Sequence, residues 1–226
     1  ASDVQLVQSI ATMSERAGLR TPPEFVVLDT DRKHMNAMAL STVLGKAYVF
    51  AAGTIKDALT RRQRDAVFAH EIAHIKHRDN LAFAVIHAGS TALKMQLYAL
   101  MVAVFSGIIL LPFTGTAELW YALKVFAVTT CILIVYDGFA AAFSRTREFL
   151  ADVGAIAILD LDHRDELIEG MATVGYNITG RRPIELLQRT RLSIFKSHPS
   201  FADRALALGV TVYAVGNHAI FRESKV

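Results

Sequence analysis

The stretch His70-Glu71-Ile72-Ala73-His74 decides how this chain is organised. On a helix, the two histidines lie on one face, one turn apart, so both imidazoles can reach a single metal ion. The glutamate between them would lie beside the open coordination position, where it can take a proton from a water molecule. The pattern therefore predicts a helix that supplies two metal ligands and the general base of a zinc peptidase.

The residues around this motif are apolar, which distinguishes metal binding from the alternative of two solvated histidines on a helix surface. Apolar residues surround the motif at Ala66, Val67, Ala69, Ile72, Ala73 and Ile75. Imidazoles buried in such a setting need polar partners, because burying an unpaired polar group is costly. We therefore expect His70 and His74 to bind a metal ion.

A catalytic zinc ion takes three protein ligands and keeps one position for water. His77 is too close on the same helix to complete the site, so the third ligand is expected from another helix. Glu148 is the best candidate, because it begins an ExxxD pair with Asp152 one turn later. A glutamate in a charged cluster is usually solvated, so the local sequence alone does not decide this assignment. Asp152 could accept an N–H from a ligating imidazole and fix its orientation.

Composition favours a membrane-associated protein over a nucleic-acid-binding one. The 226 residues are 53% hydrophobic and 20% charged, with a mean hydropathy of +0.34. The hydrophobic fraction and the mean hydropathy are high for an ordinary soluble domain, and the charged fraction is low. The net charge of +3 is too small to indicate nucleic acid as a partner. We expect one peptidase domain over residues 1–226, interrupted by a hydrophobic hairpin at about 81–143.

Two apolar stretches form this expected hairpin. Residues 97–113 carry no charge, and as a helix they would span about 26 Å, close to the thickness of a bilayer core. The second stretch, 119–143, is interrupted by Lys124 and Asp137 and leads directly into the ExxxD segment. We expect a transmembrane hairpin with a turn at 112–118. A buried helical hairpin of a soluble protein is the alternative.

The charges around the hairpin predict its orientation. The turn at 112–118 contains no lysine or arginine, whereas basic residues flank the other ends of the hairpin at Arg61, Arg62, Arg64, Lys76, Arg78, Arg145 and Arg147. The positive-inside rule then places the metal site on the cytoplasmic side of the membrane.

The remaining secondary structure follows from periodicity, caps and turn residues. We expect helices at 2–17, 54–59, 159–171 and 184–194, strands at 25–28, 36–41 and 47–50, and a glycine-rich loop at 176–183. Thr60 would cap the metal-ligand helix. No strong breaker follows, so this helix could continue through Arg78 and Asp79 into residues 81–86.

Two motifs carry a resemblance to a known family. HEIAHIKHRD at 70–79 and SRTREFLAD at 144–152, joined by a hydrophobic hairpin, resemble the HtpX-like membrane zinc peptidases. These are relatives of the CAAX prenyl endopeptidases and of the mitochondrial OMA peptidase. Asn36-Ala37-Met38-Ala39, Ser197-His198-Pro199 and Arg204 are similar to further family elements. The resemblance covers most of residues 1–209.

The resemblance implies an α+β, mostly helical fold of the zincin (gluzincin) type, with a small N-terminal sheet and an inserted transmembrane hairpin. It implies one Zn²⁺ per chain on His70, His74 and Glu148, with Glu71 as the general base.

The resemblance also assigns roles outside the metal set. Asn36, Ala37, Met38 and Ala39 would form an edge strand that pairs with a substrate peptide. His198 would lie near the cleft and stabilise the oxyanion, with a loop-capping histidine as the alternative. Arg204 is expected to hold the fold by pairing with an acidic residue such as Asp152.

The expected function is that of a membrane-associated zinc endopeptidase that hydrolyses peptide bonds of membrane or misfolded proteins. Its partners would be a protein or peptide substrate and the lipid bilayer, and the expected location is the bacterial inner membrane with the active site facing the cytoplasm. Two alternatives belong to other classes: a non-enzymatic scaffold or regulator with a structural zinc site, and a CAAX-type processing enzyme.

Overall fold

The histidine motif lies on helix α3 (Arg61–His77) in a computed structural model of the chain. The model describes residues 2–28, 37–52, 55–114, 116–159, 164–179, 199–215 and 218–223. A capping box begins α3: the Thr60 hydroxyl accepts the Gln63 N–H, and the Gln63 side chain accepts the Thr60 N–H. These two bonds satisfy N–H groups that the first turn of a helix leaves unpaired.

Helix α3 ends earlier than the sequence indicated. Arg78 adopts the left-handed conformation (φ 55°, ψ 39°), and its N–H closes the helix on the carbonyls of His74 and Ile75. A new helix, α4 (Asp79–Thr114), begins at the next residue. The expectation of one helix running through Arg78 and Asp79 is therefore wrong. A left-handed residue ends a helix, and here an arginine occupies the position that glycine usually fills.

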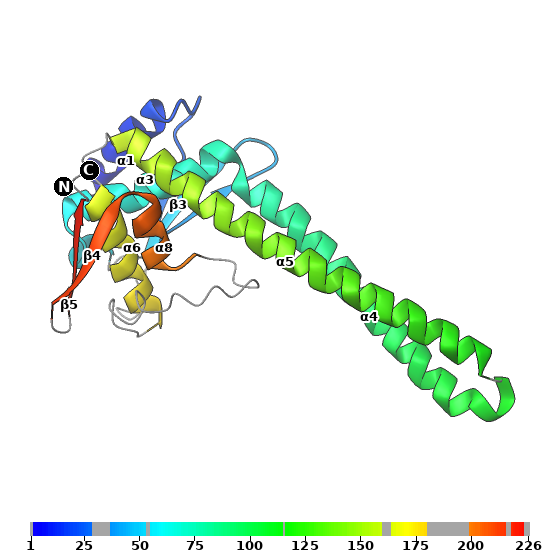
Figure 1. The fold of residues 1–226 in the computed structure, drawn as a ribbon. Helices are drawn as coiled ribbons and strands as arrows, with labels where there is room; N and C mark the ends of the chain where they lie inside the picture. Colours follow the sequence, from blue (N-terminus) through cyan, green and yellow to red (C-terminus); the bar gives the residue numbers. More distant parts are fainter. Residues whose placement is uncertain are drawn as a thin grey trace. The chain divides into compact units, whose positions relative to one another are not determined.

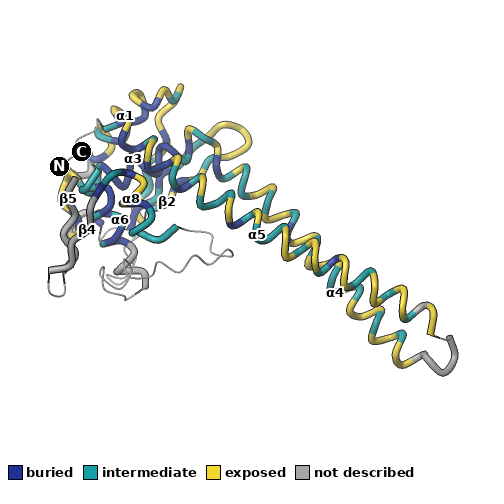
Figure 2. The backbone as a smooth tube through the Cα atoms, viewed as in Figure 1, coloured by how far each residue is buried: buried dark blue, intermediate teal, exposed yellow. Residues whose placement is uncertain are grey.

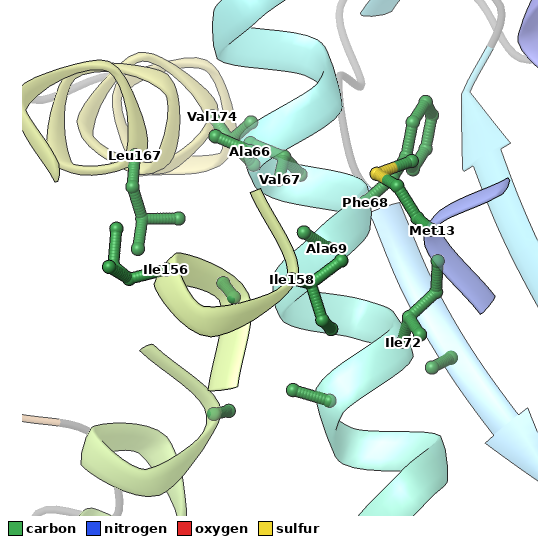
Figure 3. Packing of buried hydrophobic residues seen from close by; sticks show 14 of the residues in the cluster. Met13, Ala66, Val67, Phe68, Ala69, Ile72, Ile156, Ile158, Leu167 and Val174 are labelled. Atoms are coloured by element: carbon green, nitrogen blue, oxygen red, sulfur yellow. The ribbon is translucent and has the colours of Figure 1, made fainter. Parts of the chain in front are cut away.

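Helix α3 lies at the centre of the hydrophobic core (Figure 3). Phe68 and Ile72 on α3 are fully buried. Around them pack apolar side chains of α1 (Ser2–Arg16), α5 (Ala117–Leu159) and α6 (Arg164–Thr179), among them Met13, Ile158 and Leu167. Burying one such large apolar side chain contributes roughly 1.5–3 kcal/mol. Residues 66–73 in the middle of α3 are all buried, whereas its polar first turn is exposed (Figure 2).

A small three-stranded sheet packs beside α3. Its strands are β1 (Glu24–Leu28), β2 (Ala37–Ser41) and β3 (Ala47–Ala52), in the order β1-β3-β2. β1 runs parallel to β3, and β2 runs antiparallel to it, so β2 is an edge strand. Phe25 and Phe68 meet edge to face, with ring centroids 5.7 Å apart, between the sheet and α3. The short helix α2 (Ile55–Ala58) follows the sheet.

The C-terminal third differs from the sequence expectation. α5 continues to Leu159, and α6 extends to Thr179, so the helix expected at 159–171 is displaced and residues 176–179 are helical rather than a loop. After α8 (Phe201–Ala207), the chain forms an antiparallel hairpin of β4 (Val210–Val215) and β5 (His218–Glu223). This hairpin was not predicted, although β-branched and aromatic residues make up most of β4. The helix expected at 184–194 lies outside the described residues.

Two compact units are distinguished within the chain. One comprises residues 1–81, 145–193 and 198–226, and the other comprises residues 82–144 and 194–197. In the second unit, the α4 and α5 segments pair as two long helices (Figure 1). Phe83 and Phe143 meet edge to face, and the Tyr136 hydroxyl donates to the Ile86 carbonyl at 3.0 Å. Gly89 leaves room for that hydroxyl, which a Cβ at this position would overlap.

Both helices of this pair are long and apolar enough, by length and composition, to cross a membrane. The candidate spans are Asp79–Ile109 and Leu119–Leu159, and 0% and 11% of their most apolar windows are buried in the structure. Within the structure, the residues along these two helices are mostly exposed or half-buried (Figure 2). The connection between α4 and α5 is shorter than the expected turn at 112–118, because α4 ends at Thr114 and α5 begins at Ala117. Pro112 is part of α4, since the φ angle of proline is compatible with a helix.

Candidate metal centre

The two histidines of α3 direct their side chains to one point. Their rings lie edge to face with centroids 4.6 Å apart, and their Nε2 atoms are 3.0 Å apart. His70 is 1% exposed, and His74 is half-buried. The helical spacing of four residues therefore produces the close approach that the sequence predicted.

Glu148 reaches the same point from α5. One of its carboxylate oxygens lies 3.6 Å from His70 Nε2, and the other lies 3.9 Å from His74 Nε2. Within the described part of the chain, these three residues form the one group of histidine, cysteine and acidic side chains whose donor atoms converge, all within 4.8 Å. Gly154 lets α5 approach α3 this closely, because a Cβ there would lie 2.8 Å from the Cβ of Ala73.

The donor set fits a zinc ion. Two ligand atoms about 2.1 Å from a tetrahedral zinc are about 3.4 Å apart. The two Nε2 atoms are 3.0 Å apart, and one oxygen of Glu148 lies 3.6 Å from His70 Nε2 while the other lies 3.9 Å from His74 Nε2, close to that value. Two imidazoles and one carboxylate are three protein ligands, the number found in catalytic zinc sites that leave one position open. His77 does not belong to this donor group.

Asp152 and Arg204 surround the far side of His70. Asp152 Oδ1 lies 2.9 Å from His70 Nδ1, and Arg204 Nε donates to Asp152 Oδ2 at 2.7 Å. Arg204 also lies 3.7 Å from a carboxylate oxygen of Glu148. The structure thus brings together the Asp152–Arg204 ion pair that the sequence suggested. An aspartate on the second ring nitrogen orients Nε2 toward a metal ion.

These neighbours change the protonation of the site. Burial lowers the pKa of His70, but hydrogen bonds to Asp152 and Glu148 outweigh it and raise that pKa to about 9. Burial raises the pKa of Asp152, but the charge of Arg204 and the bond to His70 together hold it below its usual value. Without a metal ion, a proton on His70 therefore balances the buried carboxylates.

Asp79 contacts His74 as Asp152 contacts His70, and this role was not predicted from the sequence. Its Oδ2 lies 2.6 Å from His74 Nδ1, and Arg147 Nε donates to its Oδ1 at 2.5 Å. Asp79 is 1% exposed. The signal that could have found it is an acidic residue five positions after His74. This spacing brings Asp79 to His74 only because α3 ends at Arg78 and a new helix begins. The sequence had indicated an unbroken helix there.

Glu71 is buried at the edge of the sheet. Burial raises the pKa of its carboxyl group above the ordinary value of 4.5, and this carboxyl is hydrogen-bonded to the backbone of Ala39 on β2. A raised pKa brings a carboxylate closer to the neutral range in which a general base works best. The edge strand and the proposed base are therefore in direct contact.

Two of the site residues named from the sequence lie outside the described residues, namely Asn36 and His198. Ala37, Met38 and Ala39 lie on β2. Their proposed pairing with a substrate remains a prediction.

The comparison with protein families matches this geometry to a known group. The model of peptidase family M48 matches residues 1–211. The chain belongs to peptidase family M48. The HtpX-like resemblance of its motifs is thereby confirmed at the level of the family.

Among M48 relatives, the chain is similar to proteins named protease HtpX homolog. That of Chlorobium phaeobacteroides is 24% identical over 220 residues, which cover 92% of this chain and 72% of the relative. That of Herminiimonas arsenicoxydans is 27% identical over 224 residues, again covering 92% and 72%.

A solved structure, the crystal structure of S. mikatae Ste24p, matches with a TM-score of 0.54 and 20% identity. The match covers 90% of this chain, and the chain spans about half the length of Ste24p, 49%. At this identity the likeness shows a shared fold. It supports the mostly helical architecture with a small sheet described above.

Proposed function

We propose that this chain is a zinc-dependent endopeptidase of the zincin (gluzincin) type, built as one peptidase domain with the hairpin inserted between its two ligand-bearing helices. The convergence of His70, His74 and Glu148 beside the buried Glu71 carries this proposal. Membership of a peptidase family and the names of the HtpX relatives support it.

His70, His74 and Glu148 would hold one zinc ion per chain. When bound, zinc polarises a peptide carbonyl and lowers the pKa of a water molecule. Glu71 takes the proton of the attacking water and delivers it to the nitrogen of the leaving amine as the peptide C–N bond breaks. Asp152 and Asp79 keep the outer nitrogens of the two imidazoles occupied, so that both Nε2 atoms face the metal position.

Strand β2 is the proposed binding edge for an extended segment of a protein or peptide. It lies at the edge of the sheet, where the backbone of Ala39 is hydrogen-bonded to the carboxyl of Glu71. The Ala39 carbonyl already accepts from Asn80 and keeps a second lone pair for a substrate N–H. Main-chain pairing with an edge strand gives affinity with little demand on sequence. Such a site suits membrane or misfolded proteins as substrates. His198 stays a candidate for stabilising the oxyanion, and nucleic acid is not proposed as a partner.

The proposed location is the bacterial inner membrane, with α4 and α5 spanning the bilayer and the metal centre on the cytoplasmic side. The two candidate spans and the membrane-protease relatives support a membrane protein. The charge asymmetry around the hairpin supports the orientation.

Substitution of the general base provides the decisive test. Glu71→Gln keeps the shape of the side chain but cannot accept the proton, so zinc should remain bound at one per chain while cleavage of labelled casein stops. Metal analysis and a cleavage assay on the same detergent-solubilised preparation measure both. Retained cleavage would sink the mechanism.

Substitution of the third ligand tests the metal set and separates an enzyme from a scaffold with structural zinc. Glu148→Ala leaves two ligands, so zinc content after dialysis should fall well below one per chain. Unchanged zinc content in this variant would show that Glu148 is not a ligand. A wild-type protein that binds zinc but cleaves nothing, with or without a chelator, would favour the scaffold.

A further inference from the structure

A single residue, Arg78, separates α3 from α4, and Asp79 and Asn80 begin α4. Arg78 is the one non-glycine residue with a positive φ among the described residues. A side chain other than glycine pays for this conformation in free energy, so it persists only where its surroundings require it. Asp79 and Asn80 follow immediately, and both contact the site.

Asp79 uses both of its carboxylate oxygens. One oxygen lies 2.6 Å from His74 Nδ1, and the other accepts hydrogen bonds from the guanidinium of Arg147. Arg147 also donates to the His77 carbonyl at 3.4 Å, in the last turn of α3. A buried carboxylate is stable when paired and hydrogen-bonded in this way. The orientation of the His74 ring therefore depends on a carboxylate that α5 holds in place.

Asn80 contacts the edge strand. Its Nδ2 donates to the carbonyl of Ala39 at 3.0 Å. The Thr42 N–H bonds to the Lys46 carbonyl and sets the alternation of the β2–β3 ladder, so that Ala39, paired with Val49, directs its own N–H and C=O away from β3. The Ala39 backbone thus bonds to Asn80 and to the Glu71 carboxyl.

We propose that the α3–α4 junction, Arg78 with Asp79 and Asn80 at the start of α4, is a positioning element of the active site. Asp79, held by Arg147, orients His74 for the metal, and Asn80 fixes β2 beside Glu71. Asp79, Arg147 and Asn80 are positioning residues for the metal and the edge strand. This inference rests on the proposed zinc site. It adds the residues that hold the ligand His74, the base Glu71 and the edge strand β2 in position relative to one another.

The proposed role of Asp79 is tested by measuring zinc affinity in the detergent-solubilised 226-residue chain, by competition with a chromophoric chelator. Loss of a carboxylate behind a ligating histidine typically costs 10–100-fold in metal affinity. Asp79→Ala should weaken zinc binding by about that factor, and Asp79→Asn, which can still accept from His74 Nδ1, by less. Arg147→Gln keeps the aspartate and should cost several-fold.

Asp65→Asn is the matched control. Asp65 is a part-buried acidic residue on α3 itself, where it accepts from Ser9 Oγ at 3.1 Å and lies 3.8 Å from Arg61. It does not belong to the group of converging metal-donor residues. Its substitution should leave zinc affinity unchanged. If Asp79→Asn, Asp79→Ala and Arg147→Gln all fold and bind zinc as tightly as wild type, the role of Asp79 is refuted. A lower Tm with unchanged zinc affinity would show a purely structural role and also overturn it.

The proposed role of Asn80 is tested by a separate measurement, the rate of amide hydrogen exchange in residues 37–41. Asn80→Ala removes the donor to Ala39, and Asn80→Asp places a carboxylate against that carbonyl. Exchange in this segment should therefore accelerate, more for Asp than for Ala, while zinc affinity stays within twofold of wild type. For labelled casein, KM should rise with little change in kcat. Unchanged exchange in both variants would overturn this role of Asn80.

The outcomes separate the inference from the function on which it rests. Failure of the wild-type protein to bind zinc would reject the proposed function itself. Zinc binding by wild type with equal affinity in the Asp79 variants would reject only the positioning role.

Discussion

At the residue scale, His70 makes metal binding compete with a proton. Hydrogen bonds to two buried carboxylates raise its pKa to about 9, despite the opposing effect of burial. A zinc ligand must be a neutral imidazole, so zinc has to displace that proton. We expect the zinc affinity to rise by about tenfold per pH unit between pH 7 and 9 and then to level off. Chelator competition at several pH values measures it, and a flat profile in that range would contradict the proposed site.

The same pKa has the opposite consequence for the metal-free protein. A folded-state pKa of about 9, above the ordinary 6.5, means that protonated His70 stabilises the fold fully below pH 6.5. This contribution is lost as the pH rises through 9. The Tm of chelator-treated protein should therefore fall over this window while zinc affinity increases, which links the two measurements.

Individual residues of the site differed in how far the sequence could predict them. His70 and His74 follow from helical spacing, which places positions i and i+4 on one face, and the motif places Glu71 between them. Glu148 was a candidate that the local sequence did not decide, and the family resemblance implied it as the third ligand. Asp79 and Asn80 could not be predicted, because their roles depend on a left-handed Arg78. No glycine marks the end of α3 at this position, so the sequence predicted a continuous helix. Whether His198 contributes stays a prediction.

At the element scale, the site depends on how closely α5 approaches α3. A Cβ on Gly154 would lie 2.8 Å from the Cβ of Ala73, tighter than two such atoms tolerate. Gly154→Val should therefore separate the helices, destabilise the protein by about 1–3 kcal/mol, and move Glu148 away from the two histidines. Denaturant unfolding and zinc competition should both report the loss.

Gly138 offers a control on the same helix, because nothing lies within 4 Å of a Cβ built there. Gly138→Val should leave zinc affinity unchanged. Equal zinc affinity in both variants would show that the close approach at Gly154 does not hold Glu148 in place.

The elements themselves were predicted best where one periodic signal dominates. α1, α3 and the three strands of the small sheet lie close to their expected positions, because apolar spacing and caps mark them. The ends of α5 and α6 were misplaced, and β4–β5 was missed. The C-terminal segment was interpreted as helical, and a local signal was overlooked. The β-branched and aromatic run at 210–215 is followed by Gly216-Asn217, a dipeptide typical of a two-residue hairpin connection.

At the scale of the whole molecule, residues distant in sequence meet in one compact unit. The ligands on α3 and α5 and the ion pairs Asp79–Arg147 and Asp152–Arg204 all belong to it. Residues 82–144 form the other unit and contribute no ligand to the described donor set. The hairpin was predictable from length and hydropathy, because a span needs about 20 apolar residues.

The orientation of that hairpin gives the last prediction. The connection between α4 and α5 has no lysine or arginine. Lys76 and Arg145 lie near the opposite ends of the hairpin. Cysteine accessibility in intact bacterial cells tests this in a Cys131→Ala background, since Cys131 is the one cysteine in the chain. By the positive-inside rule, Thr116→Cys should react with a membrane-impermeant maleimide added outside the inner membrane, and Lys76→Cys should react only after lysis. The reverse pattern would place the metal centre on the outer face and remove cytoplasmic proteins from its possible substrates.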